Sequence, residues 1–307
     1  MAKLVECIPN FSVSREKDET VFQGLVEVAE SVPGCTLFDV QSDGNHNRCV
    51  FTLIGSPAAI EEAAFQLCKK ASETIDMRLH QGQHPRMGAT DVIPFVPQKD
   101  VSVQDCVEMS KRVAQRIWDE LHIPSFLYED SATRPERRNL AACRKGQFEG
   151  MPEKLKDTEK WTPDFGPVGR IHPTAGVTAI GARMPLVAFN VNLNTPDVEI
   201  ANKIAKRIRH LSGGYRFIKS IGVDLSDRHM AQVSMNLVNY QKTAMYRAFE
   251  AIKMEAKRYG VVPVESEIVG LLPMEALVDT ACYYLQVTED FDMDKQVMES
   301  RLLEGEE

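Results

Sequence analysis

The chain has 307 residues, of which 43% are hydrophobic and 26% are charged. This apolar content is enough for a packed core, which excludes a disordered chain, and the length suits two domains or one large one. A formal net charge of −8 excludes a sequence-independent nucleic-acid binder, because such proteins carry an excess of lysine and arginine.

Strand and helix signals alternate from the N-terminus to about residue 128. Strands are predicted where β-branched and apolar residues run together, and helices where apolar residues recur at three- and four-residue spacing. Proline and glycine punctuate them, as at Pro33, Gly34 and Pro57. The strands are expected at residues 4–9, 36–40, 48–54, 91–97 and 125–128, and the helices at 13–32, 58–74 and 102–121.

Residues 144–184 differ from the rest because glycine and proline are dense there, which prevents long regular elements. A loop of this length within a compact chain is usually functional, and it also suits a domain boundary. We place the boundary after residue 182, which gives an N-terminal domain of residues 1–182 and a C-terminal domain of residues 183–307.

The second half repeats the order of the first. Strands are predicted at residues 186–193, 217–225, 230–238 and 261–269, and helices at 197–210, 242–259 and 273–285. Both halves therefore share the order β-α-β-β-α-β. The predicted fold class is α+β, with two ferredoxin-like subdomains that face each other across a central groove.

Several common signatures are absent from the sequence. There is no GxxxxGK[ST], GxGxxG, GxSxG or HExxH motif, so a nucleotide cofactor, a serine hydrolase and a zincin have no support. The seven cysteines are scattered without a CxxC pair, and we expect reduced, mostly buried thiols. Glu6 and Pro9 interrupt the apolar stretch that a signal peptide would need at the N-terminus. No run of about 18 apolar residues is present, so no membrane-spanning helix is expected. We therefore expect a cytoplasmic protein without membrane contact.

The first of three polar clusters covers residues 42–48, between two predicted strands, and includes Asn47 and Arg48. Arg48 begins a strand, so the pleat fixes its direction, and a fixed guanidinium can bind a carboxylate through two hydrogen bonds. An ordinary loop is an equally good interpretation.

The second cluster covers residues 77–91 and contains His80 and His84. Gly82 and Pro85 prevent the helix that would place both imidazoles on one face, which argues against a metal pair. Gly82 and Gly88 are expected to let the backbone approach a ligand. His84, beside Arg86 and Asp91, suits a general base near neutral pH, and the alternative is a histidine that only caps backbone groups.

The third cluster covers residues 161–183 and mixes glycine with basic and aromatic residues, including Arg170, His172 and Arg183. This mixture suits a flat heteroaromatic ligand with an anionic tail, and the alternative is an interdomain linker. Further on, Asn190 and Asn192 alternate in a strand, as do Gln232, Ser234 and Asn236. Each set shares one strand face, which is either solvated or the floor of a groove.

Four segments carry a family resemblance: residues 5–12 (Val-Glu-Cys-Ile-Pro-Asn-Phe-Ser), 84–92 (His-Pro-Arg-Met-Gly-Ala-Thr-Asp-Val), 163–167 (Pro-Asp-Phe-Gly-Pro) and 187–193 (Val-Ala-Phe-Asn-Val-Asn-Leu). Together they resemble glutamate formimidoyltransferase, from about residue 3 to residue 288. The resemblance implies transfer of a formimidoyl group between N-formimidoyl-L-glutamate and tetrahydrofolate, in histidine degradation. It also implies two α/β subdomains around a groove and a homodimer, and the chain looks like the stand-alone bacterial form without a cyclodeaminase domain.

The resemblance also implies roles for residues. His84 matches the family's catalytic histidine, and tetrahydrofolate is the co-substrate, with no metal and no nucleotide. The folate-binding stretch matches about residues 166–176, although this sequence carries one extra residue there, and Gln41 stands where relatives can carry an acid. The expected substrate- and folate-binding residues are Asn47, Arg48, Arg86, Gly166, Pro167, Val168, Gly169, Arg170, Ile171, His172, Pro173, Thr174, Ala175, Gly176, Arg183, Asn190, Asn192 and Gln232.

Two other functions remain open on sequence alone. One is a homologue that transfers a formyl group between N-formylglutamate and 5-formyltetrahydrofolate, and the other is a folate-binding protein without turnover, which an intact His84 disfavours. For the histidine we expect a pKa lowered from about 6.5 by the neighbouring cation of Arg86. For residues 166–176 we expect a loop that a ligand orders and that is not a permanent part of the core.

Overall fold

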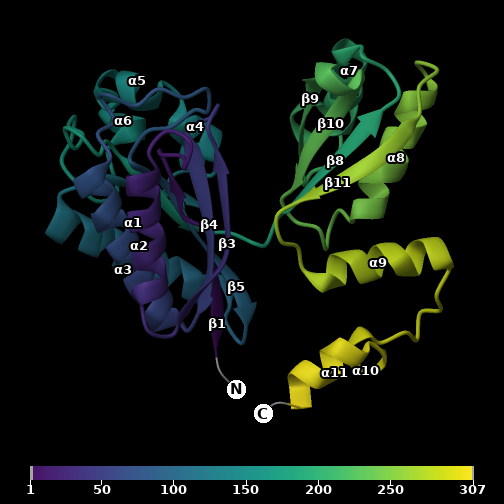
Figure 1. Cartoon of the computed structure of the whole chain (residues 1–307), viewed down its shortest axis with the longest axis horizontal. Helices are drawn as coiled ribbons and strands as arrows, with labels where there is room; N and C mark the ends of the chain where they lie inside the picture. Colours follow the sequence, from purple (N-terminus) through teal and green to yellow (C-terminus); the bar gives the residue numbers. More distant parts are fainter. Residues whose placement is uncertain (1–2, 306–307) are drawn as a thin grey trace. The chain divides into compact units, whose positions relative to one another are not determined.

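The computed structural model describes residues 3–305, and the chain divides into two compact units, Met1–Arg183 and Met184–Glu307 (Figure 1). Each unit has its own β-sheet and its own hydrophobic core. The class is mixed α/β, and each unit is described below by itself.

The first unit is built on a seven-stranded sheet. Strands β1 and β2 are separated by Ile8 and Pro9, and both pair antiparallel with β4 on one side and β5 on the other. β3 extends the sheet beyond β4, while β7 and β6 follow β5 in parallel orientation. The strands are β1 (Leu4–Cys7), β2 (Asn10–Phe11), β3 (Cys35–Asp43), β4 (Arg48–Gly55), β5 (Thr90–Lys99), β6 (Ser125–Glu129) and β7 (Thr178–Ala182).

Three long helices, α1 (Glu19–Ser31), α2 (Pro57–Thr74) and α3 (Val103–Leu121), cover one face of this sheet (Figure 1). A second, smaller core lies on the opposite face of the sheet. It includes Val92, Phe126 and Ala179, which alternate along their strands with residues of the first core. Short helices contribute to it: α4 (Leu140–Arg144) and α5 (Gln147–Lys154), with α6 (Thr158–Trp161) alongside and a 3₁₀ turn at Pro135–Arg137. The β5–β7–β6 end of the sheet is therefore covered on both faces.

The second unit has a four-stranded, fully antiparallel sheet in the order β11-β8-β10-β9. Its helices α7 and α8 pack against the apolar side of β8 and β10. The elements are β8 (Val187–Leu193), α7 (Val198–Ile208), β9 (Ile218–Leu225), β10 (Met230–Leu237), α8 (Met245–Lys257), β11 (Pro263–Val269), α9 (Met274–Leu285), α10 (Met293–Gln296) and α11 (Met298–Gly305), with 3₁₀ turns at His210–Ser212 and Ser226–Arg228. The predicted order of strands and helices in this half is confirmed.

The largest difference from the sequence prediction lies in the glycine- and proline-rich segment. Residues 178–182 form β7, which is buried along its whole length between β5 and β6. Gly181 suits this place because a Cβ there would lie 2.3 Å from the carbonyl oxygen of Tyr128. The glycine therefore marks a close approach between strands, not a loop.

The predicted helix at 13–32 is shorter than expected. It begins only at Glu19, because the side chain of Asp18 accepts a hydrogen bond from the amide of Val21 and caps the first turn. The residues before it, including Ser12 and Ser14, are buried and bond to segments of the site described next.

Candidate active site

The first two polar clusters of the sequence lie against each other in the structure. The amide of Gln83 donates to the carbonyl of Asn45 (3.2 Å), and the side-chain amide of Asn47 donates to the carbonyl of Gln81 (2.9 Å). A Cβ on Gly82 would come within 2.2 Å of the carbonyl oxygen of His46. The turn between β3 and β4 thus holds the loop that carries His84.

Two glycines of this loop lie close to the backbone of other segments. Gly82 approaches the backbone of His46, and Gly88 approaches the carbonyl of Val177, where a Cβ would come within 2.3 Å. Both glycines therefore allow two protein segments to meet closely, a role that the sequence did not reveal, and the expected approach to a ligand stays a prediction. The second contact joins the His84 loop to the segment that leads into β7.

His84 has one ring nitrogen committed to the backbone. Its Nδ1 lies 2.7 Å from the carbonyl oxygen of Pro85. A carbonyl can only accept, so Nδ1 carries the proton of the neutral ring and Nε2 keeps its lone pair. The ring also packs edge-on against His46, with centroids 5.8 Å apart. His84 is therefore held in the tautomer that offers Nε2 as a base.

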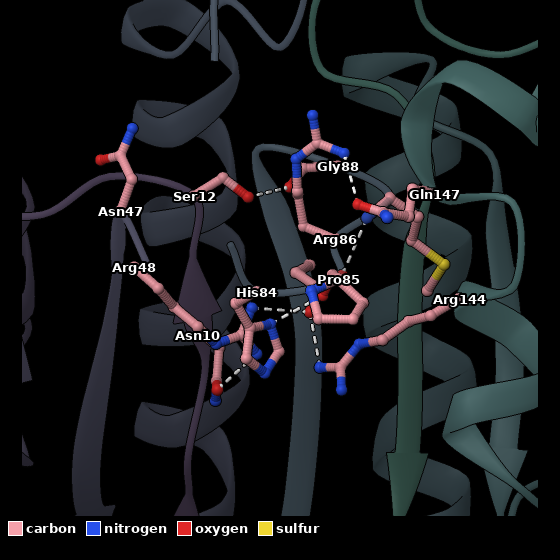
Figure 2. Close-up of polar contacts among 12 residues, drawn as sticks. Asn10, Ser12, Asn47, Arg48, His84, Pro85, Arg86, Gly88, Arg144 and Gln147 are labelled. Atoms are coloured by element: carbon pink, nitrogen blue, oxygen red, sulfur yellow. Dashed lines mark hydrogen bonds and ion pairs between the residues drawn. The ribbon is translucent and has the colours of Figure 1, made fainter. Parts of the chain in front are cut away.

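A buried charge cluster lies beside this ring (Figure 2). Asp91 is fully buried, and its Oδ2 accepts from Arg48 Nη1 (2.8 Å) and from Arg144 Nη2 (2.5 Å), while Oδ1 accepts from the amide of Met87 (3.0 Å). Figure 2 shows the two arginines reaching toward the same place from opposite sides. One carboxylate thus holds two guanidinium groups.

Asn10 fixes one of these arginines. Its Oδ1 accepts from Arg48 Nη2 (2.7 Å), and its own Nδ2 donates to the carbonyl of Ile8 (2.7 Å). Sequence reasoning named neither Asn10 nor Arg144 as a site residue. Asn10 belongs to the motif of residues 5–12, so the sequence could have indicated it. Arg144 lies in an irregular segment, where no sequence pattern points to a site residue.

The pKa of His84 is lowered to about 4. Burial is the largest cause, followed by the positive charges of Arg48 and Arg144, while Asp91 opposes them. The predicted direction is confirmed, but the predicted cause is wrong, because Arg86 is not the cation that acts on this ring.

Arg86 belongs to a different cluster. It is buried, with 6% of its surface exposed, and it binds Glu149 through two hydrogen bonds (2.8 and 2.5 Å) and Gln147 Oε1 (2.8 Å). Its Nε donates to His80 Nδ1 (3.1 Å), and His80 Nε2 lies 2.9 Å from the carbonyl of Asn47. Both ring nitrogens of His80 are therefore engaged, which leaves it no lone pair for a substrate.

The predicted folate-binding stretch has two parts with different surroundings. Residues 166–171 run over the surface, and the side chain of Val168 is 56% exposed. Residues 172–176 are pinned, because the carbonyl of Thr174 accepts from Met77 N and that of Ala175 accepts from Ala89 N, both at 2.9 Å. The expectation of a loop outside the permanent core is therefore wrong for residues 172–176.

His172 stabilises this pinned part. Its Nδ1 accepts from the amide of Ala175 (3.0 Å), and its backbone pairs with Gly176. Asp164, at the entrance of the stretch, accepts from the amide of Leu127 and from the fully buried Arg137. The Pro-Asp-Phe-Gly motif therefore anchors the loop to Ser125 and Leu127 of β6.

The polar residues predicted on one strand face of the second unit do lie together. Asn192 Nδ2 donates to Glu265 (2.7 Å), Asn190 Nδ2 donates to Glu267 (3.1 Å), and Gln232 Nε2 donates to Asn192 Oδ1 (2.9 Å). The glutamates come from β11, where the alternation of residues 263–269 places both on this face, a signal that sequence reasoning missed.

The remaining predicted residues lie elsewhere in the first unit. Arg183 follows β7, where its amide bonds to the carbonyl of Phe95 (3.0 Å) and its charge partly offsets the burial that raises the pKa of Glu6. Arg170 is exposed in the surface part of the folate stretch. Within residues 3–305, no group of three or more His, Cys, Asp or Glu side chains is arranged to hold a metal ion, and no helix is both long and apolar enough to cross a membrane.

Comparison with known proteins gives matches over almost the whole chain. Residues 4–183 match the formiminotransferase domain, N-terminal subdomain, and residues 188–302 match the formiminotransferase domain. Glutamate formimidoyltransferase from Streptococcus pyogenes serotype M1 is 64% identical over 303 residues, which are 99% of this chain and 100% of that protein. Glutamate formimidoyltransferase from Thermoplasma acidophilum is 49% identical over 92% of this chain and 93% of that protein. Formimidoyltransferase-cyclodeaminase from Rattus norvegicus is 39% identical over 96% of this chain and 55% of that protein.

Proposed function

The chain belongs to the formiminotransferase family and is a formimidoyl-transferring enzyme, and we propose that it moves this group between N-formimidoyl-L-glutamate and tetrahydrofolate, as a step of histidine degradation. The observation that carries the proposal is His84, which the loop and the Pro85 carbonyl hold with a free lone pair on Nε2. The 64% identity over the full length of a glutamate formimidoyltransferase supports the choice of donor.

His84 acts as the base in this mechanism. N5 of tetrahydrofolate attacks the formimidoyl carbon, and Nε2 takes the proton that N5 loses as the new C–N bond forms. The bond from that carbon to the glutamate nitrogen then breaks, and His84 returns the proton to the departing nitrogen. The products are 5-formimidoyltetrahydrofolate and L-glutamate, and the imidazole ends as it began. Holding both substrates at one site supplies further acceleration through proximity.

Residues 166–176 are proposed to bind the folate. In support, the pinned part of this stretch is bonded directly to residues 87–89, which follow His84 in the chain. The surface part, with Arg170, is left for contacts with the rest of a long ligand. We retain Asn47, Arg48, Arg183, Asn190, Asn192 and Gln232 as proposed substrate contacts.

We further infer a ferredoxin-like core in each unit. In support, the four strands of the second sheet have the order that this fold requires. The first strand, β8, lies between the fourth, β11, and the third, β10, and the second, β9, lies at the edge beside β10. The first sheet has the same order when β1 and β2 count as one strand, and β7 and β6 extend it. The central groove between the two units remains a prediction.

A homodimer in the cytoplasm is also proposed. β11 lies at an edge of its sheet, and large apolar side chains are exposed on it and on α9, among them Val264, Leu277, Tyr284 and Leu285. Exposed strand edges and apolar patches favour association. The seven cysteines are free thiols, five of them buried, which suits a reducing compartment.

One assay tests the proposed function. Purified protein is incubated with N-formimidoyl-L-glutamate, with and without tetrahydrofolate, and glutamate release is measured. We expect release only with tetrahydrofolate. Faster release from N-formyl-L-glutamate would identify a formyl transferase instead, and folate binding without release from either donor would contradict an enzymatic role.

A further inference from the structure

We propose that Arg144, at the end of α4, binds the α-carboxylate of the glutamate donor beside His84. The proposal rests on the function given above and adds to it a residue that fixes donor specificity. Its basis is the way Arg144 is held, the charge of its surroundings and the chemistry of the donor.

The buried carboxylate of Asp91 holds the side chain of Arg144 in the site. Its Nη2 donates to Asp91 Oδ2 at 2.5 Å, and only 16% of its side chain is exposed. Its Nε is buried without a hydrogen-bond partner among the described residues. A guanidinium has five N–H donors, so this one is oriented by Asp91 and still has donors to offer.

The charges around His84 do not balance. Arg48 and Arg144 share the single carboxylate of Asp91, which leaves an excess of one positive charge next to the imidazole. Asp43, whose partner His46 packs against the His84 ring, is bonded to His46 Nδ1 at 2.9 Å. Partly buried guanidinium groups without a full complement of acids favour an anion, and a carboxylate fits their planar donors.

The donor brings a carboxylate to this place. In N-formimidoyl-L-glutamate the nitrogen that carries the transferred group and the α-carboxylate are attached to the same carbon. A donor whose nitrogen faces His84 therefore has its α-carboxylate within reach of the neighbouring arginines. The γ-carboxylate is two methylenes further away, and the carboxylates of tetrahydrofolate lie beyond the aminobenzoyl group, far from N5.

Binding of this carboxylate also tunes the base. The two cations and burial hold the pKa of His84 at about 4, which makes it a weak base in the empty site. A carboxylate that neutralises the excess charge raises this pKa toward its ordinary value, so the base strengthens when the donor arrives. The charged and titratable groups that face the ring are Arg48, Arg144 and Asp91, with His46 and its partner Asp43 on the turn between β3 and β4.

Donor analogues test the assignment. N-formimidoyl-4-aminobutyrate lacks the α-carboxylate, and N-formimidoyl-2-aminobutyrate lacks the γ-carboxylate. We expect Arg144→Gln to raise KM for the natural donor about 10- to 100-fold, the usual range for a charge-assisted hydrogen bond. The same variant should cost about as much with the analogue that lacks the γ-carboxylate and almost nothing with the one that lacks the α-carboxylate. Arg138→Gln, an exposed arginine close by in the chain, is the matched control.

Other patterns overturn the inference. Equal losses with both analogues, or a loss that disappears only without the γ-carboxylate, would mean that Arg144 does not bind the α-carboxylate. A loss in KM for tetrahydrofolate that disappears with tetrahydropteroate would assign Arg144 to the folate tail. A wild-type protein that transfers no formimidoyl group would overturn the proposed function, and this inference with it.

A second measurement does not depend on turnover. The ring of His84 is titrated by NMR with and without L-glutamate. We expect glutamate to raise its pKa in the wild type and in Arg138→Gln, and to have little effect in Arg144→Gln. An upward shift of the same size in Arg144→Gln would contradict the proposal even if that variant were poorly active, and its melting temperature shows whether it is folded.

Discussion

Two neighbouring clusters of the first unit each combine carboxylate, guanidinium and imidazole groups, but the groups interact differently. Around Asp91, a buried carboxylate holds two arginines beside His84. Around Glu149, a carboxylate whose side chain is 62% exposed holds one arginine, Arg86, which bonds to His80. Charges balance in the second cluster and not in the first.

Under the proposed mechanism, this difference separates a reactive site from a structural one. In the Glu149 cluster both nitrogens of His80 are used, and every charge has its opposite. In the Asp91 cluster His84 keeps the lone pair of Nε2, and a positive charge is left over for an anion. Residue type alone does not distinguish the two histidines, whereas the hydrogen-bond partners of each ring do.

The largest expected effect separates the two histidines directly. His84→Ala should lower kcat by about 10²- to 10⁴-fold, because it removes the base, while His80→Ala should lower it much less. Steady-state kinetics and a melting curve on each variant measure this. A folded His84→Ala protein that keeps more than about a tenth of wild-type turnover would show that His84 is not the base.

The two carboxylates should differ in stability. Asp91→Asn leaves two partly buried guanidinium groups without a counter-charge, and we expect it to lower the free energy of unfolding by about 3 kcal/mol or more. Glu149→Gln also takes the carboxylate from the buried Arg86, but the glutamine oxygen and Gln147 can still accept from it, so the loss should be smaller, about 1–2 kcal/mol. Urea unfolding of both variants provides the comparison, which fails if the two losses are equal.

The acid limb of the pH–activity profile should depend on the Asp91 cluster and not on the Glu149 cluster. In the proposed mechanism neutral His84 is the active form, so kcat/KM of the free enzyme should fall only as the pH approaches about 4. Folding also loses stability between about pH 6.5 and 4, because the unfolded chain takes up a proton that the folded ring refuses. Arg144→Gln should move the acid limb to higher pH, and Glu149→Gln should leave it in place. An acid limb unchanged in Arg144→Gln would remove that arginine from the charge balance.

Local sequence patterns predicted most strands and helices, but they did not predict which charged side chains pair with each other. The strands and helices of the second half follow from alternation and helical spacing, and the irregular loop that carries His84 follows from its Gly82 and Pro85. Strand β7 escaped prediction, because its glycine is explained by the carbonyl of Tyr128, far away in sequence. Arg144 escaped for the same reason, since its partner Asp91 lies 53 positions earlier (144 − 91) and only the fold joins them.

Arg86 shows how a sequence neighbour can mislead, and it gives the smallest expected effect. Two residues from His84, it was expected to bind a substrate carboxylate and to lower the pKa of that histidine, but its donors go to Glu149, Gln147 and His80. Arg86→Gln should therefore lower stability by about 1–2 kcal/mol through lost hydrogen bonds, since the exposed Glu149 regains water. KM for the donor should change by less than about threefold, and the acid limb should stay in place. A rise in KM as large as that of Arg144→Gln would mean that the Glu149 pair opens for substrate, and the contrast between the two clusters would then describe only the empty enzyme.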